Sequence, residues 1–258
     1  MTYLQLTGYD GNVMEVIDDS GQSRLCKKDE SKYPLHVYYA TATYTNGSIL
    51  ACGGYDISRI DQCYIFEKNQ GWKELSKMNQ ARSSSPSIPI DGGIIVTGGY
   101  ADGFGTLKSS QIVFSDGSAI TEGPELPEPR YGHCMAYDEE NDVFFVTGGR
   151  IHKDYGAQST VWKFNDPEKF VLTGTTQMKK TRYRHACGIV RSEEHNRRPL
   201  LVTAGGDPNG DGSNNCEFYD YTKLDSQWQL CSKYKQFISC IFSAAQIVLL
   251  SFISRKLL

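Results

Sequence analysis

A short apolar strand that runs into a pair of glycines occurs four times in this chain, and this recurrence limits the possible folds more than any other feature. The pairs are Gly53-Gly54, Gly98-Gly99, Gly148-Gly149 and Gly205-Gly206. Successive pairs are 45, 50 and 57 residues apart, and a degenerate copy with Gly8 lies 45 residues before the first. Such repetition is typical of proteins built from one supersecondary unit, so we count one incomplete unit and four fuller ones.

Each unit reads as four short strands joined by turns. A second strand follows each glycine pair and the polar loop after it. This strand mixes β-branched and aromatic residues, as half-buried strands do. These strands are expected at 12–17, 62–66, 110–114, 159–164 and 216–221. A bulky residue then opens a further strand, as Trp72 and Trp228 do. The next unit starts with a short recurring segment that contains an arginine. Residues 1–233 show no hydrophobic pattern with the period of a helix.

Four-stranded units of this length, stacked side by side, make a β-propeller. The chain resembles the Kelch repeat family in its glycine pairs, its spaced tryptophans and the arginine before each first strand. The resemblance covers residues 1–233 and implies an all-β, Kelch-type β-propeller of roughly five four-stranded blades, as a complete ring or an incomplete one. It gives the glycine pairs, Trp72 and Trp228 structural roles, because glycine tolerates crowded backbone and large aromatic side chains join neighbouring blades.

The same resemblance implies a non-catalytic module that binds a partner protein or peptide through the loops at one end of the ring, in a scaffold or substrate-adaptor role. By motif match, the partner-binding residues are Arg82, Ser83, Arg130, Tyr131, Arg182 and Tyr183. Guanidinium and aromatic groups together suit an acidic or phosphorylated peptide. The alternative is that each arginine bonds loop carbonyls between blades.

Two other functions stay open on this fold, a sugar-acting enzyme and a membrane-tethered propeller. The enzyme would need convergent histidines, carboxylates or a metal in the central channel. No Gly-x-Ser-x-Gly motif, phosphate-binding glycine loop or paired-carboxylate pattern is visible, so no catalytic residue, metal or cofactor is predicted. Many Kelch proteins serve cullin ubiquitin ligases through a BTB domain, and the sequence contains no such domain to support that link.

The charge balance argues against a nucleic-acid partner, because 27 basic residues stand against 30 acidic ones and the formal net charge is −3. The first residues show neither a basic segment nor a long apolar run, which predicts no signal peptide and a cytoplasmic location. The eight cysteines are then expected to stay reduced. None of them forms a Cys-x-x-Cys pair, so no zinc ribbon or redox motif is expected.

Two further patterns have the residue types of a metal site. His133 and His185 occupy the same repeat position, three residues after an arginine, and a hydrogen-bonded strand histidine explains each better than a metal pair. The loop Asp207–Glu217 resembles the start of an EF-hand calcium loop, but its glutamate falls one position short and strands flank it. A polar inter-strand loop is the preferred interpretation.

Residues 234–258 form a hydrophobic C-terminal tail, and residues 237–253 contain no charge, glycine or proline. As a helix this stretch would span about 25 Å, short of the roughly 30 Å hydrocarbon core of a bilayer. Three interpretations stay open: a membrane anchor, a core segment that supplies the strand missing from the first unit, and a truncated or altered chain end.

Overall fold

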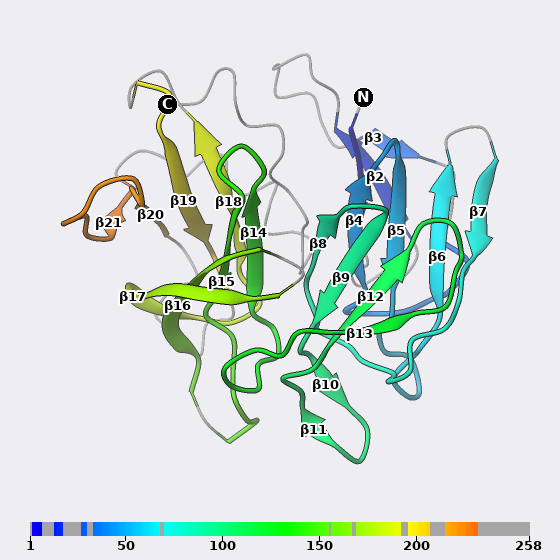
Figure 1. The fold of residues 1–258 in the computed structure, drawn as a ribbon. Helices are drawn as coiled ribbons and strands as arrows, with labels where there is room; N and C mark the ends of the chain where they lie inside the picture. The colour runs from blue at the N-terminus through cyan, green and yellow to red at the C-terminus, as the bar shows by residue number, and fades with distance from the viewer. Residues whose placement is uncertain are drawn as a thin grey trace.

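The computed structural model describes residues 33–67, 70–154, 156–166, 169–191, 196–206 and 215–231, and the backbone of three strands nearer the N-terminus. Every regular element among these residues is a β-strand (Figure 1). Four antiparallel sheets of four strands each follow one another along the chain. Together they form a β-propeller with four blades.

The strands of each blade pair in chain order. Blade 1 consists of β4 (Thr41–Thr45), β5 (Ser48–Cys52), β6 (Cys63–Glu67) and β7 (Gly71–Glu74). Blade 2 consists of β8 (Ser87–Ile90), β9 (Gly93–Thr97), β12 (Ser110–Phe114) and β13 (Thr121–Gly123). Blade 3 consists of β14 (Cys134–Asp138), β15 (Val143–Thr147), β16 (Gln158–Asn165) and β17 (Val171–Arg182). Blade 4 consists of β18 (Ala186–Arg191), β19 (Pro199–Ala204), β20 (Cys216–Tyr219) and β21 (Gln229–Leu230).

The expectation of roughly five blades is wrong, because the first unit forms a separate sheet of only three strands. These strands are β1 (Thr2–Leu6), β2 (Val13–Ile17) and β3 (Lys27–Asp29). This unit has no first strand of its own in the sequence, so it does not supply the four strands of a blade. Blade 2 carries an insertion between its second and third strands, the hairpin of β10 (Tyr100–Ala101) and β11 (Gly105–Thr106).

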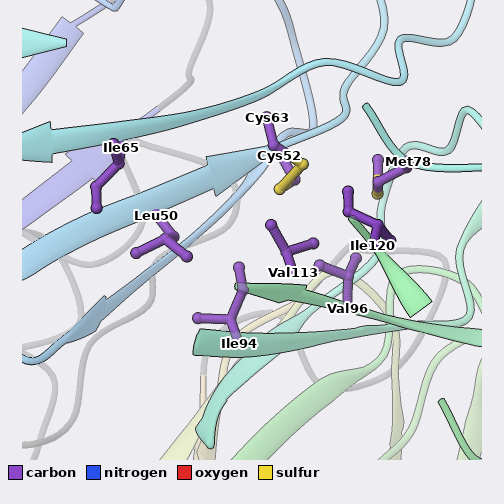
Figure 2. Packing of buried hydrophobic residues seen from close by; sticks show 9 residues of the cluster. All are labelled: Leu50, Cys52, Cys63, Ile65, Met78, Ile94, Val96, Val113 and Ile120. Atoms are coloured by element: carbon purple, nitrogen blue, oxygen red, sulfur yellow. A yellow bond between two sulfur atoms is a disulfide. The ribbon is translucent and has the colours of Figure 1, made fainter. Parts of the chain in front are cut away.

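The first strands of successive blades contact one another, β4 with β8, β8 with β14 and β14 with β18. In blades 2 and 3, side chains on the two faces of the sheet enter two different inter-blade cores. In β5, Leu50 and Cys52 pack toward blade 2 (Figure 2). Ile49 and Ala51 enter the core on the other side of the sheet. A strand buried on both faces reads as a continuous apolar run, which explains the uninterrupted hydrophobic residues before each glycine pair.

Trp72 and Trp228, two of the three tryptophans, both pack against other aromatic rings. Trp72 packs its ring against Phe66 and Tyr33, with centroid separations of 5.3 and 5.0 Å. Trp228 is buried in the core between blades 3 and 4, where it stacks on Tyr219.

The expectation of reduced cysteines is wrong, because six of them form three disulfides, Cys52–Cys63, Cys134–Cys187 and Cys216–Cys231. The spacing of the cysteines did not predict these disulfides, because strand pairing and blade packing bring together cysteines that are distant in sequence. Cys52 and Cys63 are cross-strand neighbours in blade 1, with Cα atoms 4.1 Å apart. Cys134 and Cys187 join the first strands of blades 3 and 4, with Cα atoms 5.9 Å apart.

Several sequence predictions fall on residues outside the described ranges. They are the interpretations of the tail 234–258, most of the loop that resembles an EF-hand, and the connection that contains Gly8. Within the described part of the chain, no helix has the length and hydrophobicity needed to cross a bilayer.

Candidate binding face at the glycine-pair end of the blades

The four glycine pairs lie at the same end of the blades, since each pair directly follows the second strand. We call this end the Gly-Gly face, and it also carries the connections that precede the first strands. The opposite end, which carries the turns between first and second strands and between third and fourth strands, is the turn face. The predicted partner-binding residues all belong to the Gly-Gly face.

The arginine before each first strand joins two neighbouring blades through the glycine pairs. The Arg82 carbonyl accepts the N–H of Gly54 in blade 1 at 2.9 Å, while the Arg82 guanidinium donates to the Gly98 carbonyl in blade 2 at 3.0 Å. Arg130 and Arg182 repeat both bonds at the next two joints. A Cβ atom on Gly53 would lie 2.4 Å from the Arg82 carbonyl oxygen, so the close approach requires glycine.

These three arginines are buried, with at most 1% of each residue exposed. The alternative weighed for them, that each bonds loop carbonyls, is therefore what the structure shows, and none of the three guanidiniums contributes to a surface. Ser83 is also buried, and its backbone pairs with that of Tyr100. Partner binding by this end of the molecule stays a prediction, but it has to rest on other side chains.

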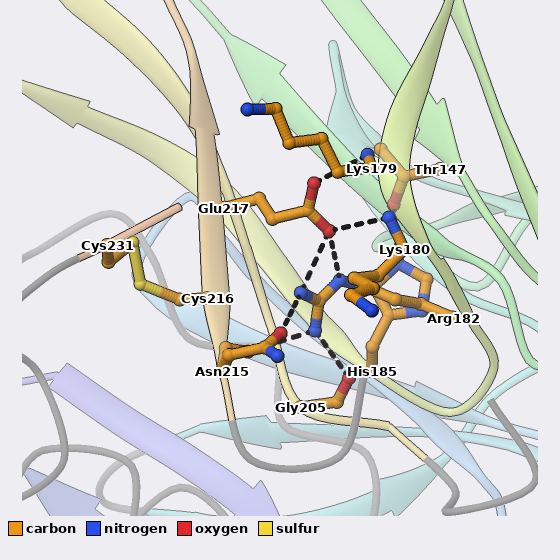
Figure 3. Close-up of polar contacts among 10 residues, drawn as sticks. All are labelled: Thr147, Lys179, Lys180, Arg182, His185, Gly205, Asn215, Cys216, Glu217 and Cys231. Carbon is orange, nitrogen blue, oxygen red and sulfur yellow. Dashed lines mark hydrogen bonds and ion pairs between the residues drawn. A yellow bond between two sulfur atoms is a disulfide. The ribbon is translucent and has the colours of Figure 1, made fainter. Parts of the chain in front are cut away.

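Two of the buried arginines, Arg130 and Arg182, meet different residues at one register position of the third strand. Arg182 forms an ion pair with Glu217 at 3.0 Å, and both side chains are fully buried (Figure 3). The Arg130 guanidinium instead lies 4.4 Å from the centre of the Trp162 ring. Burial lowers the pKa of Arg182, and the Glu217 carboxylate opposes that shift. Glu217 also accepts the backbone N–H groups of Lys179 and Lys180 in β17, so its carboxylate oxygens are occupied by bonds that join blade 4 to blade 3.

Both histidines at the shared repeat position, His133 and His185, are buried. The Nε2 atom of His185 lies 2.7 Å from the Thr147 hydroxyl oxygen. Burial lowers the pKa of His133 to about 3, with a smaller contribution from Arg130, and burial likewise lowers the pKa of His185. Both rings are therefore neutral near pH 7. Among the described residues, no three or more His, Cys, Asp or Glu side chains gather in a way that could hold a metal ion.

Backbone hydrogen bonds connect the loops that precede the four first strands. The N–H of Ser84 donates to Tyr39, that of Gly132 to Ser84, and that of Arg184 to Gly132, at 2.9, 2.8 and 2.7 Å. Three of these residues are not glycine yet have a left-handed backbone, with φ of 59° at Tyr39, 55° at Ser84 and 53° at Arg184. Such conformations persist where the surroundings hold them, and they are concentrated at functional sites.

Tyrosine and arginine side chains form a continuous group over these loops. We call this group the tyrosine–arginine belt; it consists of Tyr39, Tyr55, Arg59, Tyr100, Tyr131, Arg150, Tyr183 and Arg184. The rings of Tyr100 and Tyr131 have centroids 5.6 Å apart, and those of Tyr131 and Tyr183 have centroids 5.3 Å apart. The structure thus brings together Tyr131 and Tyr183, two of the predicted residues, although both rings are largely buried. Burial raises the pKa of the Tyr183 hydroxyl.

The three arginines of the belt all lie on tyrosine rings, but their charges are balanced differently. The Arg59 guanidinium lies between Tyr55 and Tyr100, 4.8 and 4.7 Å from their centres, and forms an ion pair with Asp102. Arg150 lies 4.5 Å from the centre of the Tyr183 ring. Arg184 lies 4.8 Å from the centre of the same ring and 4.2 Å from that of Tyr39.

Two exposed apolar side chains project from the Gly-Gly face beside the belt. Ile57 is 92% exposed in the loop of blade 1, and Phe104 is 73% exposed in the hairpin of blade 2. The two loops are adjacent, because the Arg59 N–H donates to the Asp102 carboxylate at 2.9 Å. Sequence reasoning missed both residues. Their only signal was a large apolar residue inside a polar, glycine-rich loop.

No family model matches the chain, and neither does any curated protein. Among solved structures, that of YjhT is similar, with a TM-score of 0.62 and 14% sequence identity. The similarity covers 77% of this chain and 66% of that one, so this chain spans about two thirds of the length of the YjhT structure. At this level of identity the comparison supports the propeller fold alone.

Proposed function

We propose that this chain is a Kelch-type, non-catalytic interaction module that binds a partner protein through its Gly-Gly face. The observation that carries the proposal is the exposure of Ile57 and Phe104 on adjacent loops of that face. A few anchor side chains that a partner buries supply most of the binding energy of a protein interface, and exposed apolar side chains such as these are available for that role. The tyrosine–arginine belt beside them has the composition typical of interface centres.

The alternative hypothesis of a sugar-acting enzyme receives no specific support from the described residues. The histidines at the shared repeat position are buried, and the buried carboxylates of Glu217 and Asp138 are each occupied by an ion pair with an arginine. We therefore develop the interaction module alone.

The test compares capture of binding proteins from a cell extract by the wild-type chain and by an Ile57→Ser/Phe104→Ser variant. We expect the variant to capture at least about tenfold less of any specific partner, because loss of an interface anchor commonly costs 2 kcal/mol or more. The matched control is Leu224→Ser, since Leu224 is 98% exposed but lies in the β20–β21 turn, on the turn face. Proteins captured equally by all three chains, or lost only with Leu224→Ser, would contradict the proposal.

A further inference from the structure

The sequence contains one Asn-x-Ser/Thr triplet, Asn46-Gly47-Ser48, and it lies at the turn between the first two strands of blade 1. Such a triplet is the acceptor of N-linked glycans in surface loops of secreted proteins. Thr45 and Ser48 pair across the hairpin, so Asn46 and Gly47 alone form its turn, with φ of 47° and 84°. An Asn-Gly turn of this kind accounts for the first two residues of the triplet but places no demand on Ser48.

The surroundings of Asn46 leave room for a sugar. Asn46 is exposed on the turn face, and together with Tyr44 it lines a hollow of about 800 Å³ between the first turns of blades 1, 2 and 3. Tyr44 is 39% exposed, and the faces of such rings attract the C–H groups of a sugar. The carboxylates of Asp91 and Asp142 also line the hollow and can accept hydrogen bonds from sugar hydroxyls.

The disulfides indicate the compartment in which the chain folds. Three disulfides form, and Cys134–Cys187 joins two blades across 53 residues of sequence. Disulfides form and persist in oxidising environments such as the lumen of the endoplasmic reticulum, and they are rare where glutathione keeps thiols reduced. The same lumen is where N-linked glycans are attached to asparagine. The triplet and the disulfides are independent observations, and both fit a chain that folds there.

We propose that Asn46 carries an N-linked glycan whose first sugar packs against Tyr44 in the hollow of the turn face. The donor is an oligosaccharide attached to a lipid diphosphate. A bond forms between Nδ2 of Asn46 and the anomeric carbon of the first sugar, while the bond from that carbon to the diphosphate oxygen breaks. Nδ2 loses one proton to a base of the transferase, the lipid diphosphate leaves, and nothing is oxidised or reduced.

This proposal replaces the cytoplasmic location expected from the first residues of the sequence with folding in the secretory pathway. It does not rest on the proposed function, because it concerns the opposite end of the blades. A glycan on the turn face would leave the Gly-Gly face open to a partner.

The site is tested on the full chain, secreted from cultured eukaryotic cells with a cleavable leader placed before the first residue. Peptide mass spectrometry follows Asn46 before and after treatment with an amidase that removes N-glycans. We expect a glycan on Asn46, and the amidase should convert that residue to aspartate. Secreted protein in which Cys134–Cys187 has formed but Asn46 is unmodified would overturn the site. Secreted protein with reduced cysteines would overturn the argument from the compartment.

Two substitutions at one position separate the triplet from the turn. Ser48→Ala should lower the glycosylated fraction at least about tenfold, because the acceptor triplet requires a hydroxyl at its third residue. Ser48→Thr is the matched control and should keep the glycan. Asn46→Asp removes the acceptor amide but keeps the hairpin, since Asp-Gly favours the same turn, and it should carry no glycan. A glycan retained in Ser48→Ala, or lost equally in Ser48→Thr, would contradict the assignment.

The contact with Tyr44 has a readout of its own. Removal of the glycan should lower the melting temperature of wild type by about 2 °C more than that of Tyr44→Thr, because only wild type loses a contact between ring and sugar. Leu230→Thr is the control, since Leu230 is 49% exposed outside the hollow, and its decrease should equal that of wild type. Equal decreases in wild type and Tyr44→Thr would overturn the contact.

Discussion

At the scale of single residues, the repeated arginine is a buried connector whose surroundings differ from joint to joint. Its carbonyl and its guanidinium contact the glycine pairs of two neighbouring blades, which explains why arginine and two glycines recur together. Arginine suits this position because its planar head donates several hydrogen bonds in fixed directions and stays charged even when buried. The same arginine position therefore accommodates a tryptophan ring in blade 3 and a carboxylate in blade 4.

The fully buried ion pair predicts a large effect of a single substitution. Glu217→Ala should lower the free energy of unfolding by about 3–5 kcal/mol, because it leaves the buried Arg182 guanidinium without its counter-charge. The measurement is urea denaturation followed by tryptophan fluorescence. The matched control is Glu125→Ala, which breaks an ion pair with Lys108 in which the two side chains are 55% and 51% exposed, and it should cost no more than about 1 kcal/mol. Similar losses in the two variants would contradict this account.

At the scale of strands and loops, the sequence predicted well what depends on repetition. The glycine pairs and the apolar strands before them could be placed, because those strands are buried on both faces and so appear as uninterrupted apolar runs. The number of blades could not be predicted, because the first unit resembles the others around Gly8 but lacks a strand. The arginines were assigned to the surface because their repeat position gives the loop they belong to and not the direction of the side chain.

The binding face was only partly accessible to sequence reasoning for a related reason. Tyr131 and Tyr183 could be found because they follow the repeated arginines. Arg150, Ile57 and Phe104 lie in loops of different length after the glycine pairs, so no period marks them. Arg184 stands two residues after a repeated arginine, but only the structure shows that its guanidinium lies on the rings of Tyr39 and Tyr183.

The crowding at the glycine pairs predicts the effect of adding one methyl group. Gly148→Ala should lower the free energy of unfolding by about 1–3 kcal/mol, since Gly148 has φ of 58° and its Cβ would lie 2.5 Å from the Arg182 carbonyl oxygen. Gly156→Ala is the control, because a Cβ there meets no atom within 4 Å, and its effect should stay within about 0.5 kcal/mol. Thermal melting of the two variants beside wild type provides the comparison, and equal melting temperatures would contradict the prediction.

At the scale of the whole molecule, the Cys134–Cys187 disulfide ties two blades together and closes a long segment of chain. The two cysteines are 53 residues apart, against 11 for Cys52–Cys63 and 15 for Cys216–Cys231. In the chain-entropy description of cross-links, a loop of this length restricts the unfolded state more than the short ones do.

The disulfide variant Cys134→Ala/Cys187→Ala should therefore lose about 4 kcal/mol of unfolding free energy relative to the oxidised wild-type protein. Equilibrium denaturation under non-reducing conditions measures the loss. Adding a reductant should then destabilise the wild-type protein more than the variant, because the variant has already lost its longest cross-link. A variant as stable as the oxidised protein would show that this disulfide does not constrain the unfolded chain.

The hydrogen bonds that connect Tyr39, Ser84, Gly132 and Arg184 have a consequence for how a ligand is received. These hydrogen bonds fix the backbone beneath the belt. The tyrosine rings on which Arg150 and Arg184 lie restrict the rotamers of both arginines before anything binds. A receptor ordered in advance gives up little conformational entropy on association. Changes to its contact residues are then expected to alter the dissociation rate of the complex more than the association rate. The backbone of the empty face should already have the shape that it has in the complex.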